Sequence, residues 1–268
     1  AGLGSRDVRP GDFVAVIEHL RAKKNQRFFV LGIEHPLSLP VEHEPDVRPK
    51  NAFSMRGHSV GGYGSITTNK VIATIVSDLF GLKVQAYPMY GSEKKGLPTT
   101  YFLTVADEPI GAHAELRHVD FVPLNNVNAF NLGNPLSGLV LGGTVFIQHS
   151  SRDARQIWSS IPVNARKFIQ TNRIRVLALD AIKVAQEVAS QPELAQRMQG
   201  IVLLGIFLRV APFVQKRGFS ESEVDAAVEK SLRKFFGKRG EKIVQENLMA
   251  VRRGRSEVVE IPWDVMVE

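Results

Sequence analysis

A glycine-rich segment between an expected strand and an expected helix constrains the fold of this chain more than any other feature. Residues 56–70 read Arg-Gly-His-Ser-Val-Gly-Gly-Tyr-Gly-Ser-Ile-Thr-Thr-Asn-Lys, and they fit two chemistries. Read from the second residue, they give G-x-S-x-G, the strand-to-helix elbow that exposes a nucleophilic serine, here Ser59. Read from Ser59, they give S-x-G-G-x-G, a loop whose backbone N–H groups at Gly61, Gly62 and Gly64 could hold a phosphate at a helix start.

Strand and helix signals alternate from residue 52 onward, which predicts an α/β fold. Residues 66–80 carry apolar side chains at i, i+3, i+4 and i+7, one face of a helix that Gly81 would end. The alternation favours a mostly parallel, Rossmann-like sheet with helices on both faces. Strands are expected at 52–56, 84–87, 99–105, 119–124, 144–148 and 175–179, with a turn at Gly142-Gly143 before the fifth.

The C-terminal third is expected to be helical. The apolar residues 194–214 predict one long helix or a kinked pair. Ser220-x-x-Glu223 is a capping box, which marks the start of a further helix. Shorter helices are expected at 182–188, after Asp180, and at 241–251.

The chain divides into three parts at the sequence level. Residues 1–50 predict a short N-terminal arm, with a helix at 11–20, an extended segment at 27–33 and a connector in which four prolines restrict the backbone. Residues 51–255 are expected to form the main domain. Residues 256–268 predict a loose, basic C-terminal tail.

Composition excludes several classes of function. The chain has no cysteine, which rules out disulfides, thiolate nucleophiles and cysteine-bound iron–sulfur clusters within it. Its net charge is +7, but the basic residues of the last third alternate with acidic ones and few aromatic residues lie among them, so nucleic acid is not an expected partner. No apolar stretch has the length of a membrane span and no signal pattern opens the sequence, so we expect a cytoplasmic protein.

The serine hydrolase interpretation needs a general base that follows the nucleophile late in the chain. His149 is the last histidine, and only a thin arm precedes the expected first strand. Several small residues within 61–65 also weaken the helix that should start just after the serine. A serine hydrolase with Ser59 as nucleophile therefore stays the alternative hypothesis.

Other binding sites are weaker candidates. A dinucleotide site expects an acidic residue at the end of the second strand, where residues 83–86 contain none. Residues 90–100 form a turn-rich loop in which Lys94 and Lys95 could meet phosphates as mobile charges. Asparagines at 125–134 follow a buried strand and fit either turns or the edge of a site. The seven histidines have no metal-binding spacing.

Motifs along nearly the whole chain recur in an order typical of one family. They are Ser59-x-Gly-Gly-x-Gly64 with Thr67, Asn69 and Lys70, then Tyr90–Gly96, Ile110, Gly142-Gly143, Pro162, Asp180–Glu187 and Phe236–Asn247. In order and spacing they resemble the gamma-type domain of the thiamine-diphosphate-dependent 2-oxoacid:ferredoxin oxidoreductases, the pyruvate:ferredoxin oxidoreductase family. Residues 1–50 resemble the end of the preceding domain and its connector in single-chain members, so the chain is either a fragment or a separate subunit.

The resemblance implies oxidative decarboxylation of a 2-oxoacid, usually with acyl transfer to coenzyme A and electrons passed to ferredoxin or flavodoxin. It also implies that thiamine diphosphate, magnesium and [4Fe-4S] clusters belong to partner domains or subunits, and that the isolated chain is inactive. Ser59, Gly61, Gly62, Gly64 and Thr99, with Lys94 and Lys95, would then face coenzyme A or the active-site interface. The family's first loop glycine is Ser59 here, and Leu97-Pro98 follows the lysine loop where the family has a further glycine, which leaves the choice of 2-oxoacid open.

Overall fold

The computed structural model describes residues 46–89, 96–111, 116–126 and 128–267. The helix expected at 11–20 and the extended segment expected at 27–33 lie outside these residues, as do Lys94 and Lys95. Residues 46–268 form one compact unit, and it contains the whole sheet.

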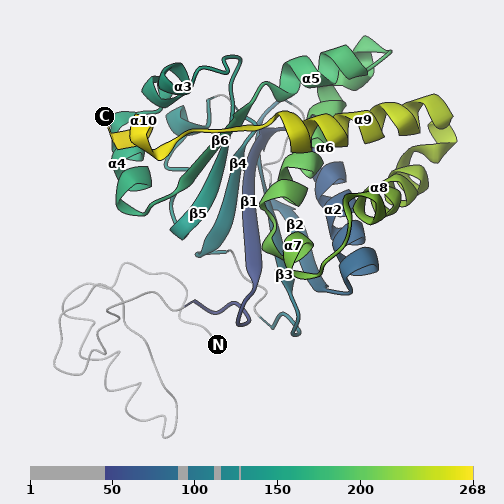
Figure 1. Cartoon of the computed structure of the whole chain (residues 1–268), viewed down its shortest axis with the longest axis horizontal. Coiled ribbons are helices and arrows are strands. Elements are labelled where there is room, and N and C mark those ends of the chain that lie inside the picture. The colour runs from purple at the N-terminus through teal and green to yellow at the C-terminus, as the bar shows by residue number, and fades with distance from the viewer. Residues whose placement is uncertain (1–45, 90–95, 112–115, 127, 268) are drawn as a thin grey trace, which may run out of the picture. The chain divides into compact units, whose positions relative to one another are not determined.

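Seven strands form one sheet in the order β2-β3-β1-β4-β5-β6-β7 (Figure 1). Strands β4, β5 and β6 run parallel to β1, whereas β3 and β7 run antiparallel to their neighbours. Because β2 is antiparallel to β3, it points the same way as β1, and five of the seven strands share one direction. The predicted mostly parallel sheet is confirmed. The strands are β1 Phe53–Val60, β2 Lys83–Met89, β3 Pro98–Ala106, β4 Val119–Leu124, β5 Leu139–Gln148, β6 Arg175–Leu179 and β7 Val259–Glu260.

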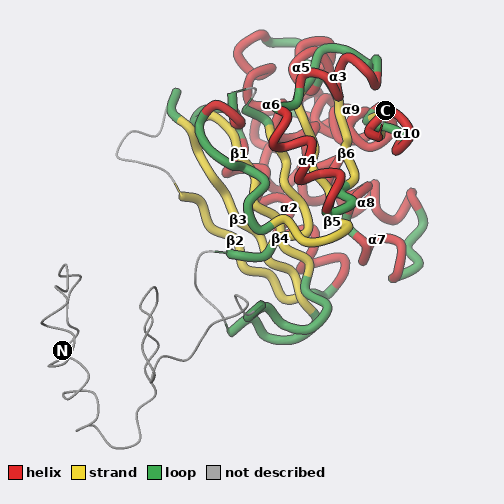
Figure 2. Tube along the Cα trace, turned by 90° about the vertical axis from the view of Figure 1, so that its left-hand side faces the viewer, coloured by secondary structure: helices red, strands yellow, loops and turns green. Residues whose placement is uncertain are grey.

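Helices cover both faces of the sheet, as predicted (Figures 1 and 2). Helices α2, α5, α6, α8 and α9 pack on one face, and α3, α4 and α10 pack on the other. The α-helices are α2 Ser65–Phe80, α3 Ala154–Ser160, α4 Val163–Thr171, α5 Ala181–Val188, α6 Pro192–Val210, α7 Pro212–Lys216, α8 Glu221–Phe236, α9 Glu241–Glu257 and α10 Trp263–Val267. Two short 3-10 helices, η1 Ala129–Asn131 and η2 Gly237–Arg239, complete the described elements.

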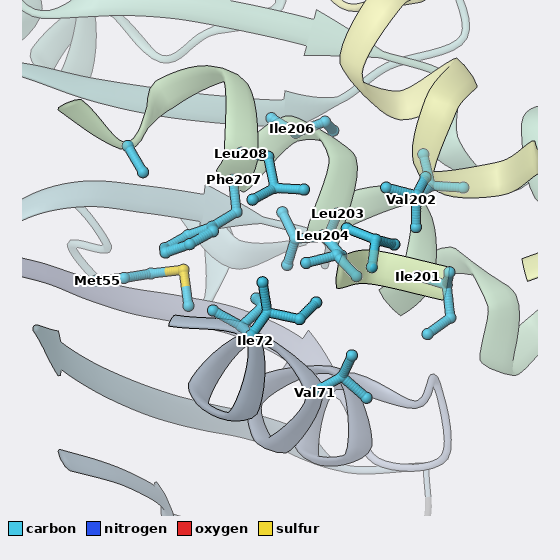
Figure 3. Close-up of a cluster of buried hydrophobic side chains, with 14 of the residues drawn as sticks. Met55, Val71, Ile72, Ile201, Val202, Leu203, Leu204, Ile206, Phe207 and Leu208 are labelled. Carbon is cyan, nitrogen blue, oxygen red and sulfur yellow. The ribbon is translucent and has the colours of Figure 1, made fainter. Parts of the chain in front are cut away.

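Alternating side chains divide the apolar core into two layers. Along β6, Leu177 and Leu179 belong to the layer under α6, whereas Val176 and Ala178 belong to the layer under α3 and α4. This division follows from the two-residue period of a strand, and it explains why the central strands read as continuous apolar runs. Figure 3 shows the first layer, in which side chains of α6 lie over Met55 of β1 and the apolar face of α2.

Helix α6 passes close to α9 because each helix carries a glycine at their crossing. A Cβ atom built on Gly205 would lie 2.0 Å from the carbonyl oxygen of Val251, and one built on Gly254 would lie 2.1 Å from that of Val202. Backbone atoms cannot move aside as a flexible side chain can. These two glycines therefore set the distance between the helices.

The structure confirms the predicted starts and ends of several helices. Gly81 ends α2 with a φ of 64°, and its N–H donates to the carbonyl oxygens of the last turn. The Asp180 side chain accepts from the Lys183 N–H at the start of α5. Ser220 and Glu223 form the expected capping box. The apolar run 194–214 is a kinked pair, since Pro212 begins a separate helix, α7.

Three expectations about local structure are wrong. The first strand continues to Val60, because it pairs with β3 along its whole length. Gly142-Gly143 is no turn before β5 but lies inside it, where the register with β4 shifts by a bulge. Residues 258–267 are not loose, because β7 pairs with β6, and Ile261 and Met266 are buried against α3 and α4.

Candidate functional site

A crevice lies at the carboxyl ends of β1 and β4. Here the chain stops adding strands on one side of β1 and begins to add them on the other. From β1 the chain passes through α2 to β2 and β3 on one side, and then it returns to β4 on the other side. Open α/β sheets bind ligands at such a switch point. A cavity of about 260 Å³ lies here, and we call it the edge cavity. Its walls come from His58 and Ser59 of β1, residues 98–100 of β3 and, after β4, residues 126, 129 and 132–135.

Ser59 lies inside a strand and not on an elbow. Its backbone pairs with Thr99 of β3, and the turn that leads into α2 starts only after Val60. A positive φ occurs at only two non-glycine residues in the described ranges, and Ser59 is neither of them. The strained elbow geometry expected of G-x-S-x-G is therefore wrong for this segment.

Among the residues that the structure describes, no catalytic base is hydrogen-bonded to Ser59. The side chain is 2% exposed, and its hydroxyl makes no hydrogen bond with any residue that the structure describes. His149 lies beyond the end of β5, two strands away from β1, and its Nδ1 accepts from the Ser151 N–H at 3.0 Å. Two strand spacings amount to about 10 Å, which is too far for proton transfer from Ser59 to His149.

The first glycine of the G-x-S-x-G motif has a packing role. Gly57 pairs with Tyr101 across β1 and β3, and a Cβ atom on Gly57 would come within 1.9 Å of the Tyr101 ring. The outer part of the ring thus occupies the space that a side chain at Gly57 would need. The Tyr101 hydroxyl donates to Asn125 Oδ1 at 3.3 Å, and complete burial raises the pKa of this hydroxyl far above its usual range.

The glycine loop and the lysine loop are joined by backbone hydrogen bonds. The Gly61 N–H donates to the Leu97 carbonyl at 2.8 Å, and the Gly96 N–H donates to the Gly61 carbonyl at 3.0 Å. Because Gly96 follows Lys95 directly, one end of the lysine loop is fixed beside Gly61. The structure thereby brings together Ser59, Gly61 and Thr99, three of the residues predicted for the site.

Gly64, the last glycine of the loop, serves the packing of helices. It is the N-cap of α2 with a φ of 80°, and a Cβ atom there would lie 2.4 Å from the Arg197 carbonyl oxygen on α6. Only glycine fits this left-handed conformation at this distance. No side-chain hydrogen bond caps this end of α2, and its first turn has no acidic residue. The predicted phosphate contact at Gly62 and Gly64 stays a prediction.

His58 is the site residue that sequence reasoning missed. Its carbonyl accepts from the N–H groups of Asn125 and Asn126 at 2.8 and 3.1 Å, which ties the end of β1 to the end of β4. Its Nε2 atom is buried and has no hydrogen-bond partner in the described part of the chain. Burial, together with the positive charge of Arg56, lowers the pKa of His58 to about 4, so the ring is neutral near pH 7. Its place between Gly57 and Ser59, at the end of a strand, was the available signal.

The asparagine loop builds turns and also borders the edge cavity. Asn126 Oδ1 accepts from the Asn128 N–H at 2.9 Å, and Asn134 Oδ1 accepts from the Leu136 N–H at 3.2 Å. Such Asx turns explain these residue types without any ligand. Both side chains belong to residues of the cavity wall, so the loop serves as scaffold and as wall.

Metal and membrane sites can be judged for the residues that the structure describes. Among them no three His, Cys, Asp or Glu residues lie close enough together to hold a metal ion. None of the described helices is long and apolar enough to cross a membrane.

Comparisons with known proteins agree with the order of motifs. The family model of pyruvate ferredoxin/flavodoxin oxidoreductase matches residues 54–257. The chain is 27% identical to the pyruvate:ferredoxin oxidoreductase of Moorella thermoacetica, over 98% of this chain and 22% of that protein. It is also 27% identical to the pyruvate-flavodoxin oxidoreductase of Trichormus variabilis, over 93% of this chain and 20% of that protein. The chain thus spans about a fifth of the length of these relatives.

Two solved structures share the fold. Pyruvate oxidoreductase subunit PORC from Thermotoga maritima superimposes with a TM-score of 0.58 at 20% identity, covering 79% of this chain and 99% of that subunit. The 2-oxoglutarate:ferredoxin oxidoreductase from Magnetococcus marinus, which has 2-oxoglutarate, coenzyme A and succinyl-CoA bound, gives a TM-score of 0.56 at 20% identity. That match covers 78% of this chain and 31% of the other.

Proposed function

This chain belongs to the pyruvate ferredoxin/flavodoxin oxidoreductase family, and on that premise we propose that it is the gamma-type part of a 2-oxoacid:ferredoxin or flavodoxin oxidoreductase. The family match, which covers almost all of the described sheet, is the observation that carries the proposal. The enzyme would oxidatively decarboxylate a pyruvate-like 2-oxoacid in the cytoplasm. The remaining parts would come from other domains or subunits, since the relatives are about five times as long.

The cofactors divide between this chain and its partners. Iron–sulfur clusters do not fit here, because the sequence has no cysteine ligands for them. A magnesium-bound thiamine diphosphate does not fit the described residues either, since no three of their acidic or histidine groups lie close enough together to hold the metal ion. Both would belong to partner domains. In the assembled enzyme, thiamine diphosphate would supply the decarboxylation chemistry.

Part of coenzyme A fits the edge cavity, which makes coenzyme A a better candidate for this chain than the two cofactors above. The walls combine polar with apolar side chains and hold no carboxylate. Hydrogen bonds fix the glycine loop and the end of the lysine loop beside one another. Phosphate groups are bound by backbone N–H groups and by mobile lysines, which Gly62, Lys94 and Lys95 would supply. The Gly61 N–H is not available for this role, because it donates to the Leu97 carbonyl. The Magnetococcus structure, which shares this fold, holds coenzyme A. The role of this chain would be to position coenzyme A at the interface with the thiamine-bearing domain.

Exposed apolar side chains near the edge cavity support contact with another domain. Met89 ends β2, Leu97 precedes β3 and Leu132 lies in the cavity wall, and their exposed fractions are 50%, 45% and 59%. Large exposed apolar side chains that gather around a polar site are typical of a protein interface.

The lysines offer the decisive experiment. In the purified multi-domain enzyme, a Lys94→Ala, Lys95→Ala double change should raise the KM for coenzyme A about tenfold or more, since charge-assisted contacts to phosphate contribute about 1.5–3 kcal/mol each. The assay follows viologen reduction with pyruvate and with 2-oxoglutarate. Lys167→Ala, an exposed lysine of α4, is the matched control. An unchanged KM for coenzyme A would remove the two lysines from the site.

Assembly is tested separately. A tagged copy of the chain should co-purify from its source with proteins that contain thiamine diphosphate and iron–sulfur clusters, and the isolated chain should show no 2-oxoacid oxidation. Recovery of the chain alone, with no bound partner at physiological salt, would contradict the proposed role. The serine hydrolase alternative makes the opposite prediction for the isolated chain, which should then react at Ser59 with a fluorophosphonate probe.

A further inference from the structure

A second cavity lies under the helices on the α6 face of the sheet. It has a volume of about 180 Å³ and is enclosed by the start of α2, the first half of α6, the end of α8, η2 and the first half of α9. We propose that this cavity, the helix cavity, binds a small organic phosphate whose charge lies between Arg197 and Arg239 and whose apolar part enters between the helices. The helix cavity shares no lining residue with the edge cavity, so the proposal does not depend on the coenzyme A assignment.

The two arginines of the helix cavity have no counter-charge in the described part of the chain. Neither Arg197 nor Arg239 makes an ion pair or donates a side-chain hydrogen bond to any residue there. Glu193 stands one turn before Arg197 on α6 and still makes no ion pair with it. No acidic residue lines the cavity. A phosphate group would supply the missing negative charge, and guanidinium groups bind it with paired hydrogen bonds.

Two other arginines on nearby helices have acidic partners, which the arginines of the helix cavity lack among the described residues. Arg233 pairs with Glu229 and Glu241, and Arg253 pairs with Glu187 and Glu257. These acids lie on α5, α8 and α9, within the helices that also enclose or adjoin the cavity. Arg233 and Arg253 thus have acidic partners, whereas the two cavity arginines have none in the described part of the chain.

The remaining walls of the helix cavity are mostly apolar, with Thr67 of α2 and Asn247 of α9 as the polar exceptions. Met198 and Ile201 of α6 and Ile243 of α9 are buried, whereas Phe235 and Phe236 at the end of α8 are partly exposed. A dry cavity of about 150 Å³ is large enough for a benzene ring, and the helix cavity exceeds that size. The combination of two unpaired cations with an apolar interior favours an aromatic or short-chain phosphate ester over inorganic phosphate.

Phenyl phosphate is the probe for this proposal. Isothermal titration of the full chain should show one saturable site for phenyl phosphate, with at least about fivefold weaker binding of inorganic phosphate and of phenol. Arg197→Gln and Arg239→Gln should each weaken phenyl phosphate binding about tenfold or more, because each removes a charge-assisted contact. Arg173→Gln is the matched control, since Arg173 is an exposed arginine that precedes β6 at the opposite edge of the sheet.

The results of these titrations either support or overturn the proposed phosphate ester site. Both cavity arginines are exposed, so their loss should leave the thermal unfolding midpoint within a few degrees, which shows that the variants are folded. No saturable binding of phenyl phosphate to the unmodified chain would overturn the proposal. Equal weakening by all three arginine changes would also overturn it, because that outcome indicates diffuse charge attraction. Equal affinity for phosphate and phenyl phosphate would exclude an apolar compartment.

Discussion

The crossing of α6 with α9 and the carboxyl edge of β1 both depend on glycine, but for different reasons. At the helix crossing, Gly205 and Gly254 make room for the backbone of the opposite helix. At the sheet edge, Gly61 uses its own N–H and carbonyl groups to bind the segment that precedes β3. Gly64 connects the two regions, since it starts α2 at the sheet edge and also lies against α6. A glycine in a sequence therefore indicates a close backbone approach, and only the fold shows what approaches.

The helix crossing should be the more sensitive of the two regions. Gly205→Ala places a methyl group 2.0 Å from one backbone atom and 2.7 Å from another, and we expect the free energy of unfolding to fall by about 3 kcal/mol. Alanine favours helix by about 1 kcal/mol over glycine, so any net loss comes from the crossing itself. Urea unfolding followed by circular dichroism measures it. Gly111→Ala is the control, because a Cβ atom there meets nothing within 4 Å.

The connecting residue should show an intermediate effect. Gly64→Ala combines a left-handed backbone, which costs about 1–2 kcal/mol, with a contact of 2.4 Å to the Arg197 carbonyl oxygen. We expect a loss of about 2–3 kcal/mol in the free energy of unfolding. If Gly64→Ala unfolds at the same urea concentration as the unmodified chain, then α6 does not hold the start of α2 as closely as described.

At the sheet edge, we expect the free energy of unfolding to depend on pH. The folded pKa of His58 is about 4 and its usual value is 6.5, so between these values the unfolded chain binds the extra proton. The contribution of His58 to the free energy of unfolding is complete above pH 6.5 and is lost as the pH falls toward 4. The free energy of unfolding should therefore fall by about 2 kcal/mol between pH 7 and pH 4.5. Urea unfolding at both pH values should show a smaller acid loss in His58→Gln. His149→Gln controls for removing a histidine elsewhere, and equal slopes in all three proteins would contradict the prediction.

The smallest effect is expected at Ser59. Its buried hydroxyl has no partner in the described chain, so Ser59→Ala should change the free energy of unfolding by less than about 1 kcal/mol. Activity of the assembled enzyme with saturating coenzyme A should stay within twofold. Fluorophosphonate labelling of the unmodified chain should be absent. Labelling that disappears in Ser59→Ala would instead establish the serine hydrolase alternative.

Regular periodicity made much of the fold predictable. The apolar face of α2, the short buried strands β4 and β6 and the capping box of α8 all depend on neighbouring residues, so their signals are local. The end of β1 was not predictable in this way. Ser59 and Val60 resemble the start of a loop, yet pairing with Thr99 and Pro98 keeps them in the strand. The same holds for β7, which is a strand only because β6 offers a free edge.

By itself, the sequence determined the fold class, six of the strands, most of the larger helices and the family, because each of these follows from spacing along the chain. It also excluded cysteine-bound iron–sulfur clusters from this chain, since the absence of a residue type can be read from composition alone. Only the tertiary structure decided what the glycines and polar residues do. Tyr101 over Gly57, α6 against Gly64 and the unpaired arginines of the helix cavity each join residues that are far apart in the sequence. Contacts of that kind depend on how the elements pack, and a one-dimensional pattern does not specify them.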